Sequence, residues 1–324
     1  MSDSPPLAER ILDGEVRAAS RLMRLVDDGY PGVRPILEEL FTHSGNADIV
    51  GFTGHPGSGK STLVNQFIGL CRQRDPTVGC IAVDPTSPFS GGAILGDRVR
   101  MNEHALDEGV FIRSVATRGN LGGLSRSTPA LVVVMDAMGF DTIIIETVGV
   151  GQDEIDIVQL ADTNIVVMVP GLGDDIQATK AGLLEIADVF AINKYDLEGA
   201  DQLKRELRAM LQLGDSTSAE EGDDRWTPPL VPTIATTGEG VDDLVESVDG
   251  HREWLEEHEQ TRTRQRRRLE QLVRLVVRGE FDRRLDDHFA GEEWETHIKN
   301  MLDRRESPFA AVDTILDDMF GEES

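Results

Sequence analysis

The residues that decide the fold are DIVGFTGHPGSGKST, positions 48–62. A short apolar run, Ile49–Thr53, leads into the pattern G-x-x-x-x-G-K-[ST] at positions 54–61, and apolar residues follow at helical spacing from Leu63. This is the phosphate-binding loop pattern in the strand–loop–helix setting that it requires. The alternative is a glycine-rich turn that carries Lys-Ser by chance. The flanking strand and helix favour a site for nucleotide phosphates.

The residue types in this loop each have a physical reason. Glycines at 54, 57 and 59 let backbone N–H groups turn inward around a phosphate, and the helix that follows points its positive N-terminus at the same anion. Lys60 supplies a mobile positive charge to the outer phosphates, and the Ser61 hydroxyl is a candidate magnesium ligand. The predicted nucleotide-binding residues of the loop are Gly54, His55, Pro56, Gly57, Ser58, Gly59, Lys60, Ser61 and Thr62.

Short apolar runs alternate with helical patterns from about residue 48 to residue 246. Near-continuous apolar runs between helices indicate a parallel sheet that is buried on both faces. The predicted fold class is α/β, a P-loop NTPase with three layers, α/β/α, and a mainly parallel sheet. In such a sheet the ligand lies at the carboxyl ends of the strands. The predicted strands are 49–53, 78–83, 111–115, 142–145, 164–169, 189–192 and 230–235.

Helical patterns flank this region on both sides. Apolar spacing predicts one helix over 7–28, a second that ends near Phe41, a long helical stretch after Gly250 and a last helix from Ser307-Pro308. We therefore expect an N-terminal helical extension at 1–46, a nucleotide (G) domain at 47–250 and a C-terminal helical arm at 251–324.

An arginine run occupies positions 262–268 of this arm. Standing alone, it would suggest an anion-binding patch. On a helix of an acidic protein we interpret it as a solvated face or as an intersubunit salt-bridge surface.

The apolar run Thr142-Ile-Ile-Ile ends in the carboxylate of Glu146, and Gly149 follows shortly after. A buried strand that delivers one acid to the mouth of the site has the geometry for holding magnesium, usually through water. The backbone N–H of Gly149 can approach a γ-phosphate, so a loop there would sense hydrolysis. The alternative role for Glu146 is an N-cap carboxylate for a helix that starts near Asp153.

The sequence Asn193-Lys194-Tyr195-Asp196 closes another apolar run and fits N-K-x-D, the guanine-selecting motif. The Asp196 carboxylate can accept from both donors on the N1 and N2 edge of guanine. Adenine offers no such pair and would leave the carboxylate unpaired, so the motif favours GTP over ATP. Lys194 can lie along the base, and Ala235 and Thr236 occupy the position of the loop behind it. The alternative is a turn at a strand end.

Two glycine-rich loops lie between the phosphate loop and Glu146. The first follows Asp84 and runs to Asp97-Arg98, and the second is 117–126, TRGNLGGLSR. Such loops at strand ends suit magnesium coordination and phosphate-sensing movement, although each also fits an ordinary surface loop. A third mobile candidate, 171–180, ends at Lys180, which is one of only five lysines; a surface lysine is the alternative.

Long strings around these motifs extend the pattern beyond nucleotide binding. AVDPTSPFSGGAILGDRVRM, TRGNLGGLSR, DTIIIETVGVGQDEI and PGLGDDIQATKAGLLEIADVFAINKYDL closely resemble the ArgK/MeaB family of P-loop GTPases, which are associated with adenosylcobalamin-dependent methylmalonyl-CoA mutase. The likeness covers roughly residues 10–290. Departures from the family pattern are His55 in the phosphate loop, Asp153, and the missing serine near Ala235.

The resemblance implies a homodimeric GTPase of the SIMIBI class that binds GTP or GDP with Mg²⁺ and dimerises through its C-terminal arm. It implies a G-protein chaperone that gates cobalamin delivery to the mutase and protects or reactivates it. By resemblance, Asp84, Asp97 and Glu146 join Ser61 around magnesium. The same resemblance makes 171–180, with Lys180, the switch that answers to the mutase, so that hydrolysis would depend on Lys60, Glu146, Gly149 and Lys180.

Two other classes of function stay open. One is a metallochaperone-type GTPase, which is expected to carry Cys or His clusters near the nucleotide. The other is a kinase that phosphorylates a transport-binding protein, which requires an acceptor site and usually ATP. The guanine-selecting Asp196 argues against ATP.

The composition excludes several classes of partner. The net charge is −27, from 59 acidic and 32 basic residues, so the surface repels nucleic acid and anionic membranes. No run reaches the roughly 18 uncharged apolar residues of a membrane span, and the N-terminus lacks signal-peptide features, so we expect a cytoplasmic location. The two cysteines, Cys71 and Cys80, form no C-x-x-C pair, which argues against a zinc site or a disulfide framework.

The charge pattern also predicts a dependence on salt. Because only five of the 32 basic residues are lysine, the chain is rich in arginine and diffusely acidic, like proteins of salt-loving organisms. Near 1 M salt the electrostatic screening length falls to about 3 Å, which removes most of the self-repulsion. We therefore expect the midpoint of thermal unfolding to be much higher in molar salt than at about 50 mM. Full thermal stability at low salt would contradict this prediction.

Overall fold

The structure is a computed structural model that describes residues 5–74, 76–84, 102–104, 106–116, 127–147, 160–171, 186–218 and 225–320. The chain forms two compact units, Met1–Gln271 and Leu272–Ser324. No helix among the described residues is long and apolar enough to cross a membrane.

Seven strands of the described residues form one sheet in the first unit, in the order β3-β2-β4-β1-β5-β6-β7. Every neighbouring pair runs parallel, which confirms the predicted α/β class. The strands are β1 (Asp48–Gly54), β2 (Val78–Asp84), β3 (Val110–Ala116), β4 (Thr142–Glu146), β5 (Thr163–Met168), β6 (Val189–Ile192) and β7 (Leu230–Pro232).

The predicted strand over 230–235 is too long. The strand β7 ends at Pro232, and Ile234 instead forms an isolated antiparallel bridge with Glu239. Gly238 and Gly240 take positive φ angles of 81° and 74°, which lets the chain turn back between these residues. The segment 233–238 is therefore a loop at the end of the strand.

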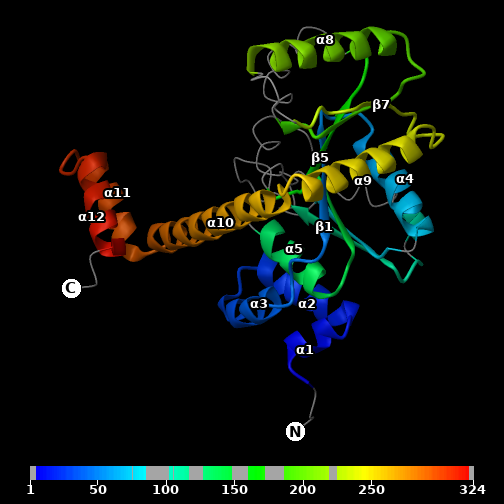
Figure 1. The fold of residues 1–324 in the computed structure, drawn as a ribbon. Helices are drawn as coiled ribbons and strands as arrows, with labels where there is room; N and C mark the ends of the chain where they lie inside the picture. Colours follow the sequence, from blue (N-terminus) through cyan, green and yellow to red (C-terminus); the bar gives the residue numbers. More distant parts are fainter. Residues whose placement is uncertain are drawn as a thin grey trace. The chain divides into compact units, whose positions relative to one another are not determined.

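Helices cover both faces of the sheet and give the predicted three layers. The helices α4 (Lys60–Gln73) and α9 (Val241–Glu257) lie side by side against one face (Figure 1). Their apolar residues share a fully buried core with alternate residues of the central strands, Phe52, Phe67 and Val167 among them. The helices α5 (Thr128–Ala137) and α8 (Ala200–Ser218) pack on the strand residues that point the other way. Burial of both faces is what makes these strands near-continuously apolar.

The N-terminal residues form α1 (Leu7–Leu12), α2 (Val16–Asp27), the 3₁₀ turn η1 (Pro31–Val33) and α3 (Arg34–Phe41). The single helix predicted over 7–28 is wrong, because Gly14 has a φ of 79° and ends α1. The N–H of Glu15 bonds the carbonyl of Arg10 there, so the chain closes one helix before the next begins. Apolar spacing continues across this break and conceals it in the sequence.

The carboxylate of Asp136, at the end of α5, fixes the segment that leads into the sheet. It accepts from the backbone N–H groups of Gly45, Asn46 and Ala47 at 2.7, 3.1 and 3.2 Å. Three donors on one buried carboxylate compensate its desolvation. Asp136 thereby sets where β1 begins.

The C-terminal residues form α10 (Thr261–Phe289), α11 (Glu292–Leu302) and α12 (Pro308–Phe320). The first unit ends within α10, at Gln271, and the rest of α10 belongs to the second unit with α11 and α12. The helix α9 continues through Gly250 to Glu257. The three-part division at 46 and 250 stays a prediction.

Two arginines of α10 form ion pairs with carboxylates that lie just before strands of the sheet. The Arg264 guanidinium lies 2.5 Å from Oδ1 of Asp188, before β6, and Arg268 lies 2.9 Å from Oδ2 of Asp162, before β5. For these two arginines the predicted solvated or intersubunit face is wrong, because both form partly buried ion pairs within their own chain. Arg266 does lie in solvent, paired with Glu270 on the same helix.

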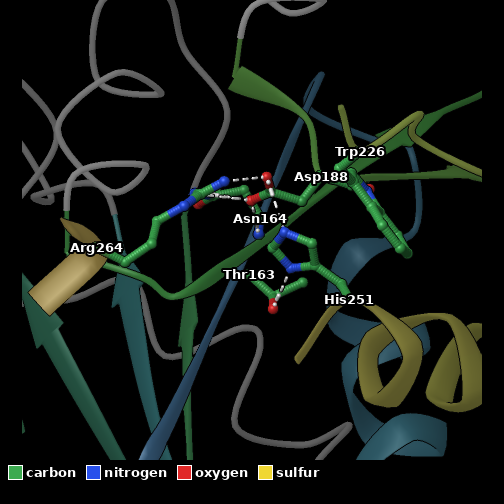
Figure 2. A network of polar contacts seen from close by, with 6 residues as sticks. All are labelled: Thr163, Asn164, Asp188, Trp226, His251 and Arg264. Carbon is green, nitrogen blue, oxygen red and sulfur yellow. Dashed lines mark hydrogen bonds and ion pairs between the residues drawn. The ribbon is translucent and has the colours of Figure 1, made fainter. Parts of the chain in front are cut away.

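The Asp188 carboxylate is the centre of a buried polar cluster, which Figure 2 shows from close by. The cluster includes His251 of α9, whose side chain is fully buried and whose Nδ1 lies 2.8 Å from the hydroxyl of Thr163. Burial lowers the pKa of His251 to about 4; Asp188 acts to raise this pKa, and Arg264 acts to lower it. The imidazole is therefore neutral at pH 7.

The free energy of unfolding should fall as the pH drops from about 6.5 to about 4. The unfolded chain takes up a proton on His251 near pH 6.5, whereas the folded chain resists protonation down to about pH 4. The difference amounts to roughly 2 to 3 kcal/mol at the acid end. Urea unfolding of the wild type and of His251→Gln at pH 7 and pH 4.5 measures it. The two proteins have the same carboxylates and differ in titratable groups only at His251, so equal pH slopes would contradict the prediction.

Candidate nucleotide-binding site

The phosphate loop begins where β1 ends at Gly54 and closes at Gly59, the residue before α4. Gly54 and Gly59 have φ angles of 140° and 89°. A Cβ on Gly54 would lie 2.3 Å from the carbonyl oxygen of Val167, and one on Gly59 would lie 2.5 Å from Nδ2 of Asn193. Glycine is therefore required at both positions for the loop to approach β5 and the segment after β6.

The Lys60 side chain is drawn into this loop and is only 6% exposed. Its Nζ donates to the carbonyl oxygens of Gly54 at 2.7 Å and His55 at 3.1 Å. A buried ammonium group needs such acceptors because its desolvation is otherwise very costly. Lys60 thus lies inside the loop that is predicted to hold phosphate.

Ser61 and Glu146 meet at the end of β4. The Ser61 hydroxyl donates to Oε1 of Glu146 at 2.6 Å, and Glu146 is only 5% exposed. Glu146 pairs in register with Phe52 on β1, and Ser61 lies in the first turn of α4, which follows β1 through the phosphate loop. Two oxygen donors of this kind fit Mg²⁺, which prefers carboxylate and hydroxyl oxygens.

Asn193, which follows β6, joins three loops through its side-chain amide. Its Nδ2 donates to the carbonyl oxygen of Ser58 at 2.7 Å. Its Oδ1 accepts from the N–H of Ala235 at 3.0 Å and from the Thr233 hydroxyl at 3.4 Å. The phosphate loop, the N-K-x-D segment and the loop after β7 are therefore held together by one buried residue.

Lys194 adds a second link between the same loops. It takes a left-handed φ of 55°, and its Nζ donates to the carbonyl oxygen of Gly57 at 2.8 Å. Asp196 and Thr236 are exposed, and Ala235 is buried. The carboxylate of Asp196 is thus open to a ligand.

Several predicted residues lie outside the described part of the chain. They are Asp97, Gly149 and Lys180, together with the loop 117–126 and the side chain of Asp84. The backbone of Asp84 closes β2, paired with Ala116 of β3. Their proposed functions stay predictions.

Two polar residues near the site were not predicted. Glu103 and His104, in the 3₁₀ turn η2 (Asn102–His104), both bind Asn65 of α4. The Asn65 amide donates to Glu103 at 2.9 Å, and Nε2 of His104 donates to the Asn65 carbonyl at 3.0 Å. These contacts attach η2 to the helix that begins at Lys60. Single polar residues with no fixed spacing give no signal in a sequence.

A family model described as methylmalonyl Co-A mutase-associated GTPase MeaB matches residues 19–289. The chain belongs to this family. A protein of Pyrococcus abyssi named as a GTPase is 46% identical over 315 residues, which cover 97% of this chain and 96% of the relative. The GTPase ArgK of Escherichia coli is 32% identical over 309 residues, with 93% and 92% covered.

A solved structure of an LAO/AO transport system kinase shares the fold with a TM-score of 0.67 and 25% identity, covering 97% of this chain and 96% of that one. The predicted MeaB/ArgK membership and the P-loop NTPase fold are confirmed. The chain is a GTPase of the MeaB family, which binds GTP and GDP.

Two glycines of the loop provide a matched test of its geometry. Gly57→Ala adds a methyl group into open space at a φ of 78°, so it should cost roughly 1 to 2 kcal/mol of unfolding free energy through backbone strain alone. Gly59→Ala should cost about 1 to 3 kcal/mol more, because it displaces the Asn193 amide from Ser58. Urea unfolding of the nucleotide-free proteins measures both, and equal costs would contradict the assigned contact.

Proposed function

We propose that the chain is a G-protein chaperone of an adenosylcobalamin-dependent acyl-CoA mutase, methylmalonyl-CoA mutase or a relative. In this proposal it hydrolyses GTP to GDP and phosphate, gates cofactor loading and protects or reactivates the mutase. The family match over residues 19–289 supports the mutase as partner. Nucleotide binding is supported most directly by the contacts of Asn193, which join the phosphate loop to the guanine motif.

Lys60, Ser61 and Glu146 form the proposed phosphate and metal end of the site. Lys60 exchanges its two carbonyl acceptors for outer phosphate oxygens. Ser61 and Glu146 hold magnesium, with Asp84 and Asp97 as further acids. Bound Mg²⁺ supplies positive charge that offsets the charge of the phosphates. The 2.6 Å contact between Ser61 and Glu146 supports this assignment.

Asn193, Lys194 and Asp196 form the proposed guanine end, with Ala235 and Thr236 behind the base. Asn193 positions the loops, and Asp196 accepts from the N1 and N2 edge of guanine. An exposed carboxylate beside a fixed loop supports this assignment. Gly149 and the switch residue Lys180 complete the proposal from their sequence positions alone.

We further propose a homodimer that forms through the second unit. Three apolar residues of α10, Val273, Val276 and Val277, lie on one helical face and are 58–62% exposed. On α12, Phe309, Val312 and Leu316 repeat this arrangement. Exposed apolar faces of this kind mark protein interfaces. The net charge of −27 supports a protein partner rather than nucleic acid or an anionic membrane. The proposed location is the cytoplasm.

The mutase proposal is tested by GTP turnover in molar salt, with and without the cobalamin-dependent mutase of the same organism. We expect the mutase to raise the turnover number about tenfold or more, because ordering the switch segment positions the reacting water. Lys180→Ala should lose this acceleration, whereas Lys204→Ala, on α8, should behave as the wild type.

An unchanged rate would contradict the mutase as partner and leave a GTPase with another target. Transfer of labelled γ-phosphate to a protein would instead support the kinase alternative. A requirement for nickel or another transition metal in the partner would support the metallochaperone alternative.

A further inference from the structure

The Asp188 carboxylate accepts hydrogen bonds from two side chains and one backbone group, and it faces a third side chain. Arg264 of α10 reaches both of its oxygens, at 2.5 Å and 3.2 Å. The backbone N–H and the side-chain amide of Asn164 donate to Oδ2 at 2.9 and 3.1 Å. Nε2 of His251 lies 3.4 Å from Oδ1 (Figure 2). Asp188 is 6% exposed, so this set of partners fixes its position.

Asp188 immediately precedes β6, and Asn193 immediately follows it. The strand has only four residues, all buried, and it pairs with β5 on one side and β7 on the other. Five residues of extended chain span roughly 17 Å. Because a strand bonded on both sides cannot bend or change length easily, a shift of Asp188 is carried to Asn193.

The far end of this strand is the guanine motif. The backbone N–H of Asn193 bonds the carbonyl of Met168 at 2.8 Å, and its side chain bonds Ser58. We propose that Arg264 is a positioning residue for the guanine motif, acting through Asp188 and β6. This inference rests on the proposed guanine-binding function of Asn193, Lys194 and Asp196.

The position of His251 indicates where Asp188 would move without Arg264. Nε2 of His251 makes no hydrogen bond in the described structure, and it faces Oδ1 of the same carboxylate. A buried carboxylate that loses its cationic partner is strongly destabilised unless another positive or hydrogen-bonding group replaces it. Asp188 therefore turns toward His251, and the start of β6 moves with it.

Arg268 provides a matched control on the same helix. It binds Asp162 at the start of β5, one helical turn away from Arg264, and it is also partly buried. The strand β5 does not end in the guanine motif. Removing Arg268 should loosen α10 to a similar degree, but Arg264 still fixes Asp188, so the effect on Asn193 should be much smaller.

The test compares affinities for GDP and for inorganic pyrophosphate, which lacks the base, by calorimetry with Mg²⁺ in molar salt. Arg264→Gln should weaken GDP binding about five- to tenfold and change pyrophosphate binding less than about twofold. Arg268→Gln should leave the ratio of the two affinities unchanged. Arg264→Lys keeps the charge but cannot span both oxygens, so it should weaken GDP binding by about two- to threefold. This second variant also tests the proposal if Arg264→Gln does not fold.

Equal losses for GDP and pyrophosphate, no loss for either, or the same change of ratio in Arg268→Gln would each overturn the proposal. Asp196→Asn separates the two levels of inference, because it should lower the affinity for GDP and not for pyrophosphate. If Asp196→Asn leaves the ratio unchanged, the guanine assignment and this inference both fail. If Asp196→Asn changes it and the Arg264 variants do not, only the coupling fails.

An independent measurement follows the imidazole of His251. In Arg264→Gln its proton NMR signal should titrate at a higher pH than in the wild type, since the pKa of His251 loses the lowering effect of Arg264 and keeps the raising effect of Asp188. Arg268→Gln should leave this titration unchanged. An unchanged titration in Arg264→Gln would overturn the assigned contact of Arg264 with the Asp188 and His251 pair, and the proposal with it.

Discussion

The buried amide of Asn193 is the contact on which the shape of the nucleotide site depends. Its nitrogen donates to the phosphate loop and its oxygen accepts from the loop after β7, so neither loop can move without breaking a hydrogen bond in a nearly dry environment. Such bonds contribute little net stability, but leaving their partners unmade costs about 1 to 3 kcal/mol for each buried group. Because an unmade bond costs more than a made bond contributes, other positions of the two loops are disfavoured. The Asn193 amide also explains why Gly59 has no room for a Cβ, which would occupy the place of the amide.

The parallel sheet places the proposed ligand-binding groups at one end of its strands and the groups that anchor α10 at the other end. Glu146 and Asn193 lie just at or after the carboxyl ends of their strands, whereas Asp162 and Asp188 lie just before the starts of theirs. Both edges carry polar groups, and between them the central strands are mostly apolar and buried. The arginines of α10 bind one edge and the predicted ligand binds the other. Short, straight strands connect the two, which makes an anchor at one edge relevant to the geometry of the other.

Local sequence patterns predicted most of the groups at the carboxyl ends of the strands and none of the ion pairs at the starts of the strands. The phosphate loop and the N-K-x-D segment are contiguous in sequence, so their spacing carries the chemistry, and parallel pairing brings them together. Arg264 and Asp188 are 76 positions apart, and no spacing relates them. For the same reason the arginine run was interpreted from its own helix, as a solvated or intersubunit face. The break at Gly14 was missed because apolar spacing continues on both sides of it, and a single positive φ angle decides the backbone there.

The groups of the site already satisfy one another, and this determines how it can bind a ligand. Lys60 bonds two neutral carbonyls, and Ser61 bonds the Glu146 carboxylate. At the phosphate and metal end of the site, a ligand must therefore replace these existing hydrogen bonds. Hydrogen bonds between charged partners are roughly twice as strong as those between neutral ones. The exchange favours Lys60 only when the new acceptor is an anion. It favours Glu146 and Ser61 only when a cation takes the place of the proton that lies between their oxygens. An anion and a cation are needed together, which is the charge pattern of a nucleotide phosphate with its magnesium ion.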